Sequence, residues 1–507
     1  MNSGRIYLNF MSHTTSGFHR VMNLGRSFRL LSAVVLMAAV FGLGRVGYAQ
    51  ISTPQPVGAV AEAPRFWQFA LVPPMGWNSY DTFGDSVTEA ETVANAQFMK
   101  DHLLAHGWNY VVVDFRWYDP VATYNDNDLT RQRLGATLTA DQYGRMLPAT
   151  NRFPSAMNDQ GFKPLADKLH AMGLKFGFHM MRGIPRQAVY AHTPIEGGSF
   201  TADEAGNTNN KCGWCPDMFG VRNNEAGQAW YDSMYRLYAS WGLDFVKVDD
   251  LSNPYHRDEI EMIRKAIDHC GRAIVLSTSA GPTDRRQGDH IQSHANMWRV
   301  SGDFWDEWRK LNAQFELLNQ WQGVGGPGHF PDADMIPFGH LSIRAWTNSR
   351  EHQTRFTHDE QRMLMSLWSL ASSPLMLGGN LPDTDDWTLA LLTNDEVLGI
   401  DQDPLGRAAK RVVQNAGLEV WVKDLKDGSK AVGLFNRSAA DAPVTVNWSD
   451  AGLTGAQRVR DVWEHRDLDG ATEQITRPVP AHGVVLLRLA AGKRGGVGNE
   501  NGKRGGS

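Results

Sequence analysis

Two carboxylates, each at the end of an apolar segment, are the side chains in this sequence best suited to chemistry. Asp249 ends the apolar run 243–249, which also contains Lys247, and Asp303 follows a second run at 297–301. The alternation typical of a strand places Lys247 and Asp249 on one face. An unpaired charge inside a protein is costly, so we expect both to face each other or a wet cleft. Two carboxylates at separate strand ends are typical of glycoside hydrolysis.

The elements that would position these carboxylates alternate along the central part of the chain. Short apolar runs separate longer amphipathic stretches, which indicates βα units and a parallel sheet. We expect strands at 75–79, 109–114, 174–179, 245–249, 273–278, 297–301, 323–329 and 374–377. The helices expected between them include 89–106, 162–172, 226–241, 259–269 and 304–320. This pattern predicts an α/β fold, a (β/α)8 TIM barrel, with Asp114, Asp249 and Asp303 at the C-terminal strand ends, where barrel active sites lie.

The pattern changes after the barrel. The chain has 507 residues, more than one core usually holds, so we expect a barrel over 73–403 and a second domain over 404–491. Short alternating strands separated by turn residues predict an antiparallel β-sandwich there, with strands at 419–422, 430–435, 444–448, 457–461 and 483–489. Residues 50–72 are expected to be a linker, and the Gly- and Lys-rich residues 492–507 a disordered tail.

The N-terminal residues have the form of a secretory signal peptide. In residues 1–49, arginines precede the apolar run 30–43, and Gly47-Tyr48-Ala49 follows. We expect cleavage after Ala49 and a secreted or periplasmic protein; a start at Met22 would give a more ordinary signal. The alternative is a membrane anchor, but the run is shorter than the ~20 residues that span a bilayer. We expect no membrane association once the signal is removed.

Composition and cysteine count exclude several classes of function. The net charge is -5 and no long basic run occurs outside the tail, so nothing indicates nucleic-acid binding. The chain has three cysteines, so at least one thiol is free and disulfides cannot hold this fold together. Cys212 and Cys215 form a CxxC pair, but no second pair or histidine follows at zinc-ligand spacing. The pair therefore favours a loop disulfide over a metal site.

Five motifs in a fixed order resemble glycoside hydrolase family 27, the α-galactosidases and α-N-acetylgalactosaminidases. They lie at 74–79 (PMGWNS), 247–249 (KVD), 298–303 (WRVSGD), 326–335 (GPGHFPDADM) and 400–406 (IDQDPLG). The resemblance implies that Asp249 attacks the anomeric carbon and that Asp303 protonates the leaving oxygen and then activates water, with retention and without a cofactor. A retaining pair stands about 5–5.5 Å apart. Lys247 would favour the ionised form of Asp249.

The resemblance also implies sugar contacts, and two departures bear on the sugar. Arg299 resembles the family arginine that contacts the 2-hydroxyl, and Trp77 resembles the aromatic wall. Many members end the second strand in an Asp-Asp pair that holds the 4- and 6-hydroxyls, but here Asp114 is followed by Phe115. Losing one charged acceptor costs about 1.5–3 kcal/mol unless another residue replaces it. Ser279 lies where galactose-selective relatives carry a 2-hydroxyl-binding Glu, which leaves room for a larger 2-substituent.

Asp332 and Asp334 share one face of the loop at the seventh strand, where they either line the pocket or make structural hydrogen bonds. The predicted substrate-binding residues are Trp77, Asp114, Lys247, Ser279, Arg299 and Asp332, and no metal site is expected. We expect a retaining α-galactosidase that acts on an oligosaccharide or polysaccharide. The alternatives are an α-N-acetylgalactosaminidase, a β-L-arabinopyranosidase or another α-glycosidase, and, in a different class, a non-catalytic carbohydrate-binding protein. The sequence does not indicate an oligomeric state.

Overall fold

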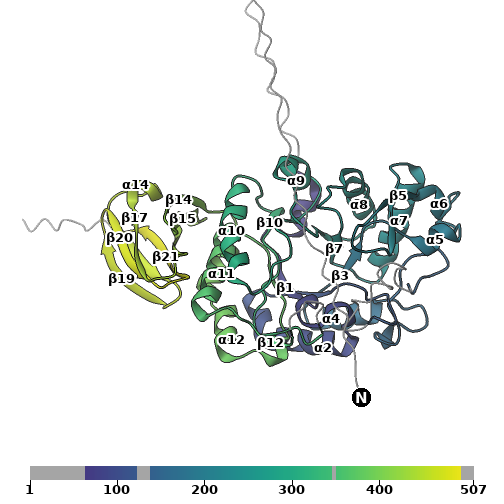
Figure 1. Ribbon diagram of the computed structural model, residues 1–507, viewed down its shortest axis with the longest axis horizontal. Helices are drawn as coiled ribbons and strands as arrows, with labels where there is room; N and C mark the ends of the chain where they lie inside the picture. Colours follow the sequence, from purple (N-terminus) through teal and green to yellow (C-terminus); the bar gives the residue numbers. More distant parts are fainter. Residues whose placement is uncertain (1–62, 123–137, 345–349, 493–507) are drawn as a thin grey trace, which may run out of the picture. The chain divides into compact units, whose positions relative to one another are not determined.

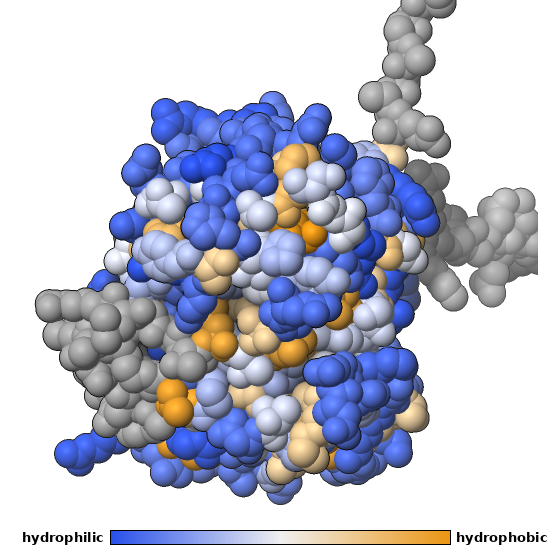
Figure 2. Space-filling model, turned by 90° about the vertical axis from the view of Figure 1, so that its right-hand side faces the viewer, coloured by the Kyte–Doolittle hydropathy of each residue, from blue (hydrophilic) through white to orange (hydrophobic). Residues whose placement is uncertain are grey.

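The computed structural model describes residues 63–122, 138–344 and 350–492, and the structural statements below concern these ranges. The predicted signal peptide, most of the predicted linker and the tail from 493 onward lie outside them. Within these ranges, no helix combines the length and apolar character needed to cross a membrane. On the face drawn in Figure 2, apolar residues are scattered among hydrophilic ones and form no continuous patch.

Eight parallel strands form the central sheet, in the order β10-β9-β8-β7-β3-β2-β1-β13 (Figure 1). Their bounds are β1 (Met75–Asn78), β2 (Tyr110–Val113), β3 (Lys175–Met181), β7 (Phe245–Asp249), β8 (Val275–Thr278), β9 (Met297–Arg299), β10 (Phe330–Asp332) and β13 (Leu375–Leu377). The two ends of the sheet meet where Ile336, shortly after β10, forms a parallel bridge with Leu377 of β13. The sheet is therefore a closed barrel, as the sequence predicted.

The seventh barrel strand lies later than predicted. The segment expected at 323–329 contains a tight turn, in which Gly326 and His329 exchange backbone hydrogen bonds of 2.9 and 3.0 Å. Gly328 has φ +94°, and a Cβ there would lie 2.3 Å from a Trp67 backbone atom. The glycines thus make a close turn, and the strand is β10, which follows it.

Helices cover the outside of the barrel. The main ones are α2 (Glu89–Phe98), continued by η3 (Met99–Leu103) and η4 (Leu104–His106), then α4 (Lys163–Ala171), α7 (Glu225–Ser240), α8 (Arg257–His269), α10 (Trp308–Gln320), α11 (His358–Ala371), α12 (Asp386–Leu392) and α13 (Asp395–Asp401). Shorter elements are η1 (Arg65–Phe69), α1 (Tyr80–Phe83), η2 (Gly84–Ser86), η5 (Pro154–Ala156), β4 (Ile184–Pro185), α5 (Arg186–Tyr190), α6 (Ala202–Ala205), β5 (Gly206–Lys211), β6 (Met218–Val221), η6 (Arg285–Gln287), α9 (Gly288–Gln292), β11 (His340–Leu341), β12 (His352–Gln353) and η7 (Leu381–Asp383). Helix α10 begins four residues later than predicted, because residues 304–307 form part of the loop that carries Asp303.

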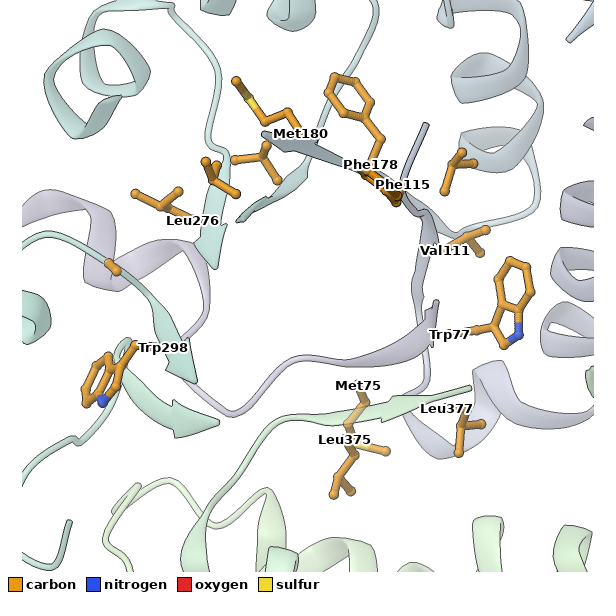
Figure 3. Close-up of a cluster of buried hydrophobic side chains, with 14 of the residues drawn as sticks. Met75, Trp77, Val111, Phe115, Phe178, Met180, Leu276, Trp298, Leu375 and Leu377 are labelled. Carbon is orange, nitrogen blue, oxygen red and sulfur yellow. The ribbon is translucent and has the colours of Figure 1, made fainter. Parts of the chain in front are cut away.

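Side chains alternate between the two faces of the barrel strands. Figure 3 shows Trp77, Val111, Leu276 and Trp298 pointing away from the centre of the barrel, and they belong to the main hydrophobic core. A second, smaller cluster comes from the opposite faces of the same strands, with Tyr110, Val112, Phe245, Val275 and Met297. On β7, the alternation that buries Val246 and Val248 in the main core places Lys247 and Asp249 on the inner face, as predicted.

The C-terminal strands form the predicted sandwich. Its strands are β14 (Lys410–Asn415), β15 (Leu418–Asp424), β16 (Lys430–Asn436), β17 (Ala442–Asn447), β18 (Gln457–Asp461), β19 (Arg466–Ala471), β20 (Gln474–Val479) and β21 (Gly483–Ala491), with the short helix α14 (Trp448–Ala451). A six-stranded antiparallel sheet, β14-β15-β16-β21-β18-β19, packs with the pair β17-β20 around a core of its own. Phe315 of α10 packs edge-on against Trp421 and Phe435, so the main core extends from the barrel into the sandwich.

The end of the expected linker is packed against the barrel. In η1, Phe66 is buried, and its carbonyl accepts a hydrogen bond of 3.0 Å from Asn296. The neighbouring Trp67 stacks on His329 with ring centroids 4.0 Å apart. This segment therefore helps to hold the turn before β10.

Candidate active site

A cavity of about 680 Å³ lies at the C-terminal ends of the barrel strands. This volume suits a small ligand of one or two rings. The polar and aromatic residues that line it include Tyr80, Asp81, Asp85, Asp114, Phe115, Arg116, Trp214, Lys247, Asp249, Arg299, Asp303, Trp305 and Asp334. The cavity thus brings together both predicted catalytic carboxylates and three predicted substrate-binding residues, Asp114, Lys247 and Arg299.

Asp249 ends β7 and is only 7% exposed. Its Oδ2 atom lies 3.0 Å from Nε2 of His179, which is on the neighbouring strand β3. Burial opposes ionisation, but Lys247 and His179 outweigh it and lower the pKa of Asp249 well below the usual range. The site therefore holds a buried carboxylate that stays ionised at neutral pH.

Lys247 and Asp114 form a second charged pair in the cavity. Lys247 Nζ lies 3.0 Å from Asp114 Oδ2, and Asn78 donates to the same oxygen at 2.5 Å. The other carboxylate oxygen accepts the backbone N–H of Phe115 at 2.8 Å. Burial disfavours the charged ammonium, yet Asp114 and Asp249 raise the pKa of Lys247 above its usual value. This pair presents both a donor and an acceptor to a ligand.

Arg299 links Asp303 to the barrel. Its Nη2 lies 2.7 Å from Asp334 Oδ2 and 3.2 Å from Asp303 Oδ1. Asp334 also accepts the backbone N–H of Phe304 at 2.7 Å, which fixes the loop beside Asp303. The Arg299 side chain is buried, whereas that of Asp303 is 68% exposed. Asp303 therefore lies at the mouth of the cavity and Asp249 lies deep in it.

Ser279 and Asp332 lie below the main cavity, beside a void of about 20 Å³. Ser279 is 1% exposed, and its hydroxyl accepts a hydrogen bond of 3.3 Å from Arg299, so this small residue opens no room in the main cavity. Asp332 accepts the backbone N–H of Asp334 at 2.8 Å. Burial and the charge of Asp334 raise the pKa of Asp332 to about 6. Of the two acids expected here, Asp334 is the one that lines the main cavity.

Trp77 does not form the expected aromatic wall. Its side chain is fully buried on the outside of the barrel (Figure 3), and its indole donates to Gly379 O at 2.8 Å. Tyr80, three residues later, lines the cavity instead, with Lys247 Nζ 5.8 Å from its ring centroid. The alternation along β1 carried this information, because Asn78 faces inward and Trp77 must then face outward.

Two carboxylates were missed by the sequence reasoning. Asp81 and Asp85 follow β1 and both line the cavity. Burial raises the pKa of Asp81 well above its usual value, with a further contribution from Asp334. Asp85 lies 3.7 Å from Arg116, whose guanidinium is also 3.6 Å from Asp217. The sequence could have indicated them, because Asp81 and Asp85 follow shortly after the motif at 74–79.

The expected disulfide is not formed in this structure. Cys212 and Cys215 are free thiols, and the backbone N–H of Cys215 lies 3.3 Å from Cys212 Sγ, to which it donates. Burial raises the pKa of Cys212 to about 12 and that of Cys215 well above its usual value, so both stay protonated. The turn between them exposes Trp214 at the mouth of the cavity.

Within the described ranges, the group with metal-ligand spacing is Glu261, His290 and His294, outside the cavity. The two imidazoles stack with centroids 4.1 Å apart. His290 also contacts Tyr255 Oη at 2.5 Å and Glu261 at 3.1 Å through its two ring nitrogens. This geometry is that of a hydrogen-bonded pair rather than of two rings directed at one ion.

Comparison with known proteins agrees with this site. Residues 224–403 match the family model described as alpha galactosidase A, and residues 415–489 match that of the alpha galactosidase C-terminal beta sandwich domain. An alpha-galactosidase of Cyamopsis tetragonoloba is 30% identical over 422 residues, which cover 82% of this chain and 86% of that protein. Alpha-galactosidase A of Cellvibrio japonicus is 28% identical over 89% of this chain and 98% of its own length.

Among solved structures, the chain is similar to a GH27 β-L-arabinopyranosidase variant of Geobacillus stearothermophilus in complex with arabinose. It is 46% identical with a TM-score of 0.81, and the match covers 85% of this chain and 99% of that one. The family models, the long matches to relatives and the shared barrel and sandwich agree with the five motifs. The chain belongs to the α-galactosidase family, glycoside hydrolase family 27.

Proposed function

We propose that this glycoside hydrolase is a retaining α-galactosidase, with Asp249 as nucleophile and Asp303 as acid and base. The observation that carries this proposal is the contrast between the two carboxylates that face one cavity. Asp249 is buried and ionised, as a nucleophile must be, whereas Asp303 is exposed at the mouth, where a leaving group and water arrive.

The reaction takes two steps. In the first, an Asp249 oxygen bonds to the anomeric carbon while Asp303 gives its proton to the departing oxygen. In the second, Asp303 takes a proton from water, whose oxygen bonds to the anomeric carbon and releases Asp249. Two inversions give net retention, and the retaining separation of the two carboxylates stays a prediction. Arg299, 3.2 Å from Asp303, is placed to orient that carboxylate in both steps.

β-L-Arabinopyranoside hydrolysis is a second candidate, and Phe115 favours it. α-D-Galactopyranose and β-L-arabinopyranose share their ring configuration and differ by the hydroxymethyl group on C5. The Arg116 guanidinium lies over the Phe115 ring at 4.9 Å. Phe115 lines the cavity at the position where the family resemblance implies the second acid of the pair that holds the 4-hydroxyl and the 6-hydroxyl. An apolar wall here gives no acceptor to that hydroxyl, but it suits a ring that lacks it. The 46% identical relative is named for this activity.

Hydrolysis of nitrophenyl glycosides by the purified protein tests both proposals. We expect turnover of the α-D-galactoside and of the β-L-arabinopyranoside, and loss of both in Asp249→Asn. The substrate with the higher kcat/KM identifies the preferred sugar and decides between the two candidates. The first sugar product, followed by NMR, should have the anomeric configuration of the substrate. An inverted product would contradict the assigned mechanism, and activity retained by Asp249→Asn would contradict the assigned nucleophile.

We also propose that the enzyme is exported. The support is the signal-like segment 1–49, with its apolar run and the Ala49 cleavage site. N-terminal sequencing of protein recovered from the periplasm or medium should begin at Gln50. Recovery of all the enzyme in the cytoplasm with an uncleaved N-terminus would contradict this.

A further inference from the structure

One tryptophan at the mouth of the cavity stands out by its exposure. Trp214 is 48% exposed, and no other tryptophan in the described ranges is an exposed side chain. An indole gains more than most side chains from leaving water. A half-exposed indole that lines an active-site cavity is therefore suited to being covered by a bound molecule.

Two side chains, Phe115 and His179, connect Trp214 with the proposed nucleophile Asp249. Its ring meets Phe115 edge-on, with centroids 5.9 Å apart and an interplanar angle of 60°. Phe115 in turn packs edge-on against His179 at 5.2 Å, and His179 lies 3.0 Å from Asp249. Phe115 is nearly buried whereas Trp214 reaches solvent, so the aromatic contacts run from the bottom of the cavity to its mouth.

The position of Asp303 indicates which part of a substrate reaches the mouth. A group that protonates the leaving oxygen must lie beside the bond that is cleaved, and Asp303 is 68% exposed. When the terminal sugar contacts Asp249, the unit beyond that oxygen therefore lies toward solvent, in the part of the cavity that includes Trp214.

We propose that Trp214 is the platform of a leaving-group subsite, on which the apolar face of the second sugar ring of an oligosaccharide stacks. This inference rests on the proposed glycosidase function. The turn that carries Trp214 is held from inside by the buried Cys215, so the indole is offered by a fixed backbone. Stacking on an aromatic face tolerates different linkages, whereas the polar pair Lys247 and Asp114 deep in the site requires a defined ring.

The test compares two substrates with the same terminal sugar. A glycosyl fluoride has no second ring, and a disaccharide has one. We expect Trp214→Ala to lower kcat/KM for the disaccharide about 10-fold and to leave that for the fluoride within about 2-fold. Trp214→Phe, which keeps a flat ring, should recover most of the loss. Tyr190→Ala is the matched control. Tyr190 is 70% exposed and packs on Phe219 of β6, the strand that follows the turn with Trp214, but it does not line the cavity.

An equal loss of kcat/KM on both substrates, or no loss on the disaccharide, would contradict the proposal that Trp214 binds the second sugar ring. A wild-type enzyme that fails to cleave the fluoride would refute the proposed function instead. Calorimetry with the Asp249→Asn variant then still tests the subsite. The disaccharide should bind more tightly than the monosaccharide, and Trp214→Ala should abolish that difference; an unchanged difference would refute the inference.

Discussion

Phe115 is the residue that most directly separates the two candidate sugars. Phe115→Asp would restore the carboxylate that many relatives carry, and the Arg116 guanidinium is within reach to balance its charge. A charged acceptor contributes about 1.5–3 kcal/mol, which corresponds to a change of about 10- to 100-fold. We expect the ratio of kcat/KM for the α-galactoside over the β-L-arabinopyranoside to rise by that factor. Phe115→Leu should leave the ratio nearly unchanged, and an unchanged ratio in Phe115→Asp would refute the role given to this position.

Asp332 should make stability depend on pH. Its pKa of about 6 in the folded protein lies above the usual value, so the folded state holds a proton that the unfolded chain releases. Stability is then lost as pH rises from about 4 to about 6, by up to about 2–3 kcal/mol. Asp332→Asn cannot ionise, and its melting temperature relative to wild type should rise across this window. Melting curves at pH 4.5 and 7.5 that show the same difference would contradict this.

Sequence reasoning at the residue scale succeeded for charged residues on strands, because a buried charge is unfavourable unless it faces a hydrated cleft or a partner of opposite charge. Lys247, Asp249 and Arg299 are charged residues on strands, and all three line the cavity. Asp249 and Arg299 are buried, and the Lys247 side chain is 15% exposed. It failed for Trp77, because an aromatic side chain is equally stable in the core. The position of Ser279 below the cavity depends on the Arg299 side chain, which no local pattern reveals.

At the scale of elements, a buried ion network connects the ends of β3 and β7 to α8. Arg182 lies 2.9 Å from Asp250 and 2.6 Å from Glu259, and all three side chains are nearly inaccessible. Asp250 thus has a structural role as an ion-pair partner of Arg182.

Arg182→Met should destabilise the protein by about 3–5 kcal/mol, because it leaves two buried carboxyl groups without their cation. Arg257→Ala, at the first residue of α8, is the control. Its ion pair with Glu261 is exposed, so the free energy of unfolding should change by less than about 1 kcal/mol. Denaturant unfolding measures both, and similar losses in the two variants would contradict the assignment.

The predicted barrel strands were recognised because they are apolar runs between amphipathic helices. β10 was misplaced because it has three residues, Phe-Pro-Asp, too few for any periodicity to show. The start of α10 was misplaced because hydrogen bonding of Phe304 to Asp334, from a distant loop, competes with the helix. Both errors concern contacts between segments far apart in the sequence.

At the scale of the whole molecule, the sandwich is joined to the barrel through a buried lysine. Lys423 of β15 donates to Ser369 O at 2.8 Å and to Ser372 Oγ at 2.7 Å, both at the end of α11. Burial lowers the pKa of Lys423 to about 8, and burial raises that of Asp401, at the end of α13, to about 8. The charge of each group offsets part of the shift of the other, since Asp401 favours the Lys423 ammonium and Lys423 favours the Asp401 carboxylate.

We expect Lys423→Met to cost about 1–3 kcal/mol of unfolding free energy, because Ser369 O and Ser372 Oγ lose their buried donor. Asp401→Asn removes the carboxyl whose charge favours the Lys423 ammonium and should cost less. The double variant should cost less than the sum of the two single changes, because Lys423 and Asp401 each favour the charged form of the other. Chemical denaturation of the four proteins gives the coupling energy. Additive losses would show that Lys423 and Asp401 act independently.

The solvent exposure of the Asp303 side chain affects which products the enzyme forms as well as which bonds it cleaves. In its proposed role as acid and base, Asp303 has a side chain that is 68% exposed, so alcohols as well as water can reach it from solvent. We therefore expect sugars and simple alcohols at high concentration to compete with water for the glycosyl group that the proposed mechanism places on Asp249. The ratio of hydrolysis to transglycosylation is then set by the concentrations of water and of other hydroxyl compounds in the solution.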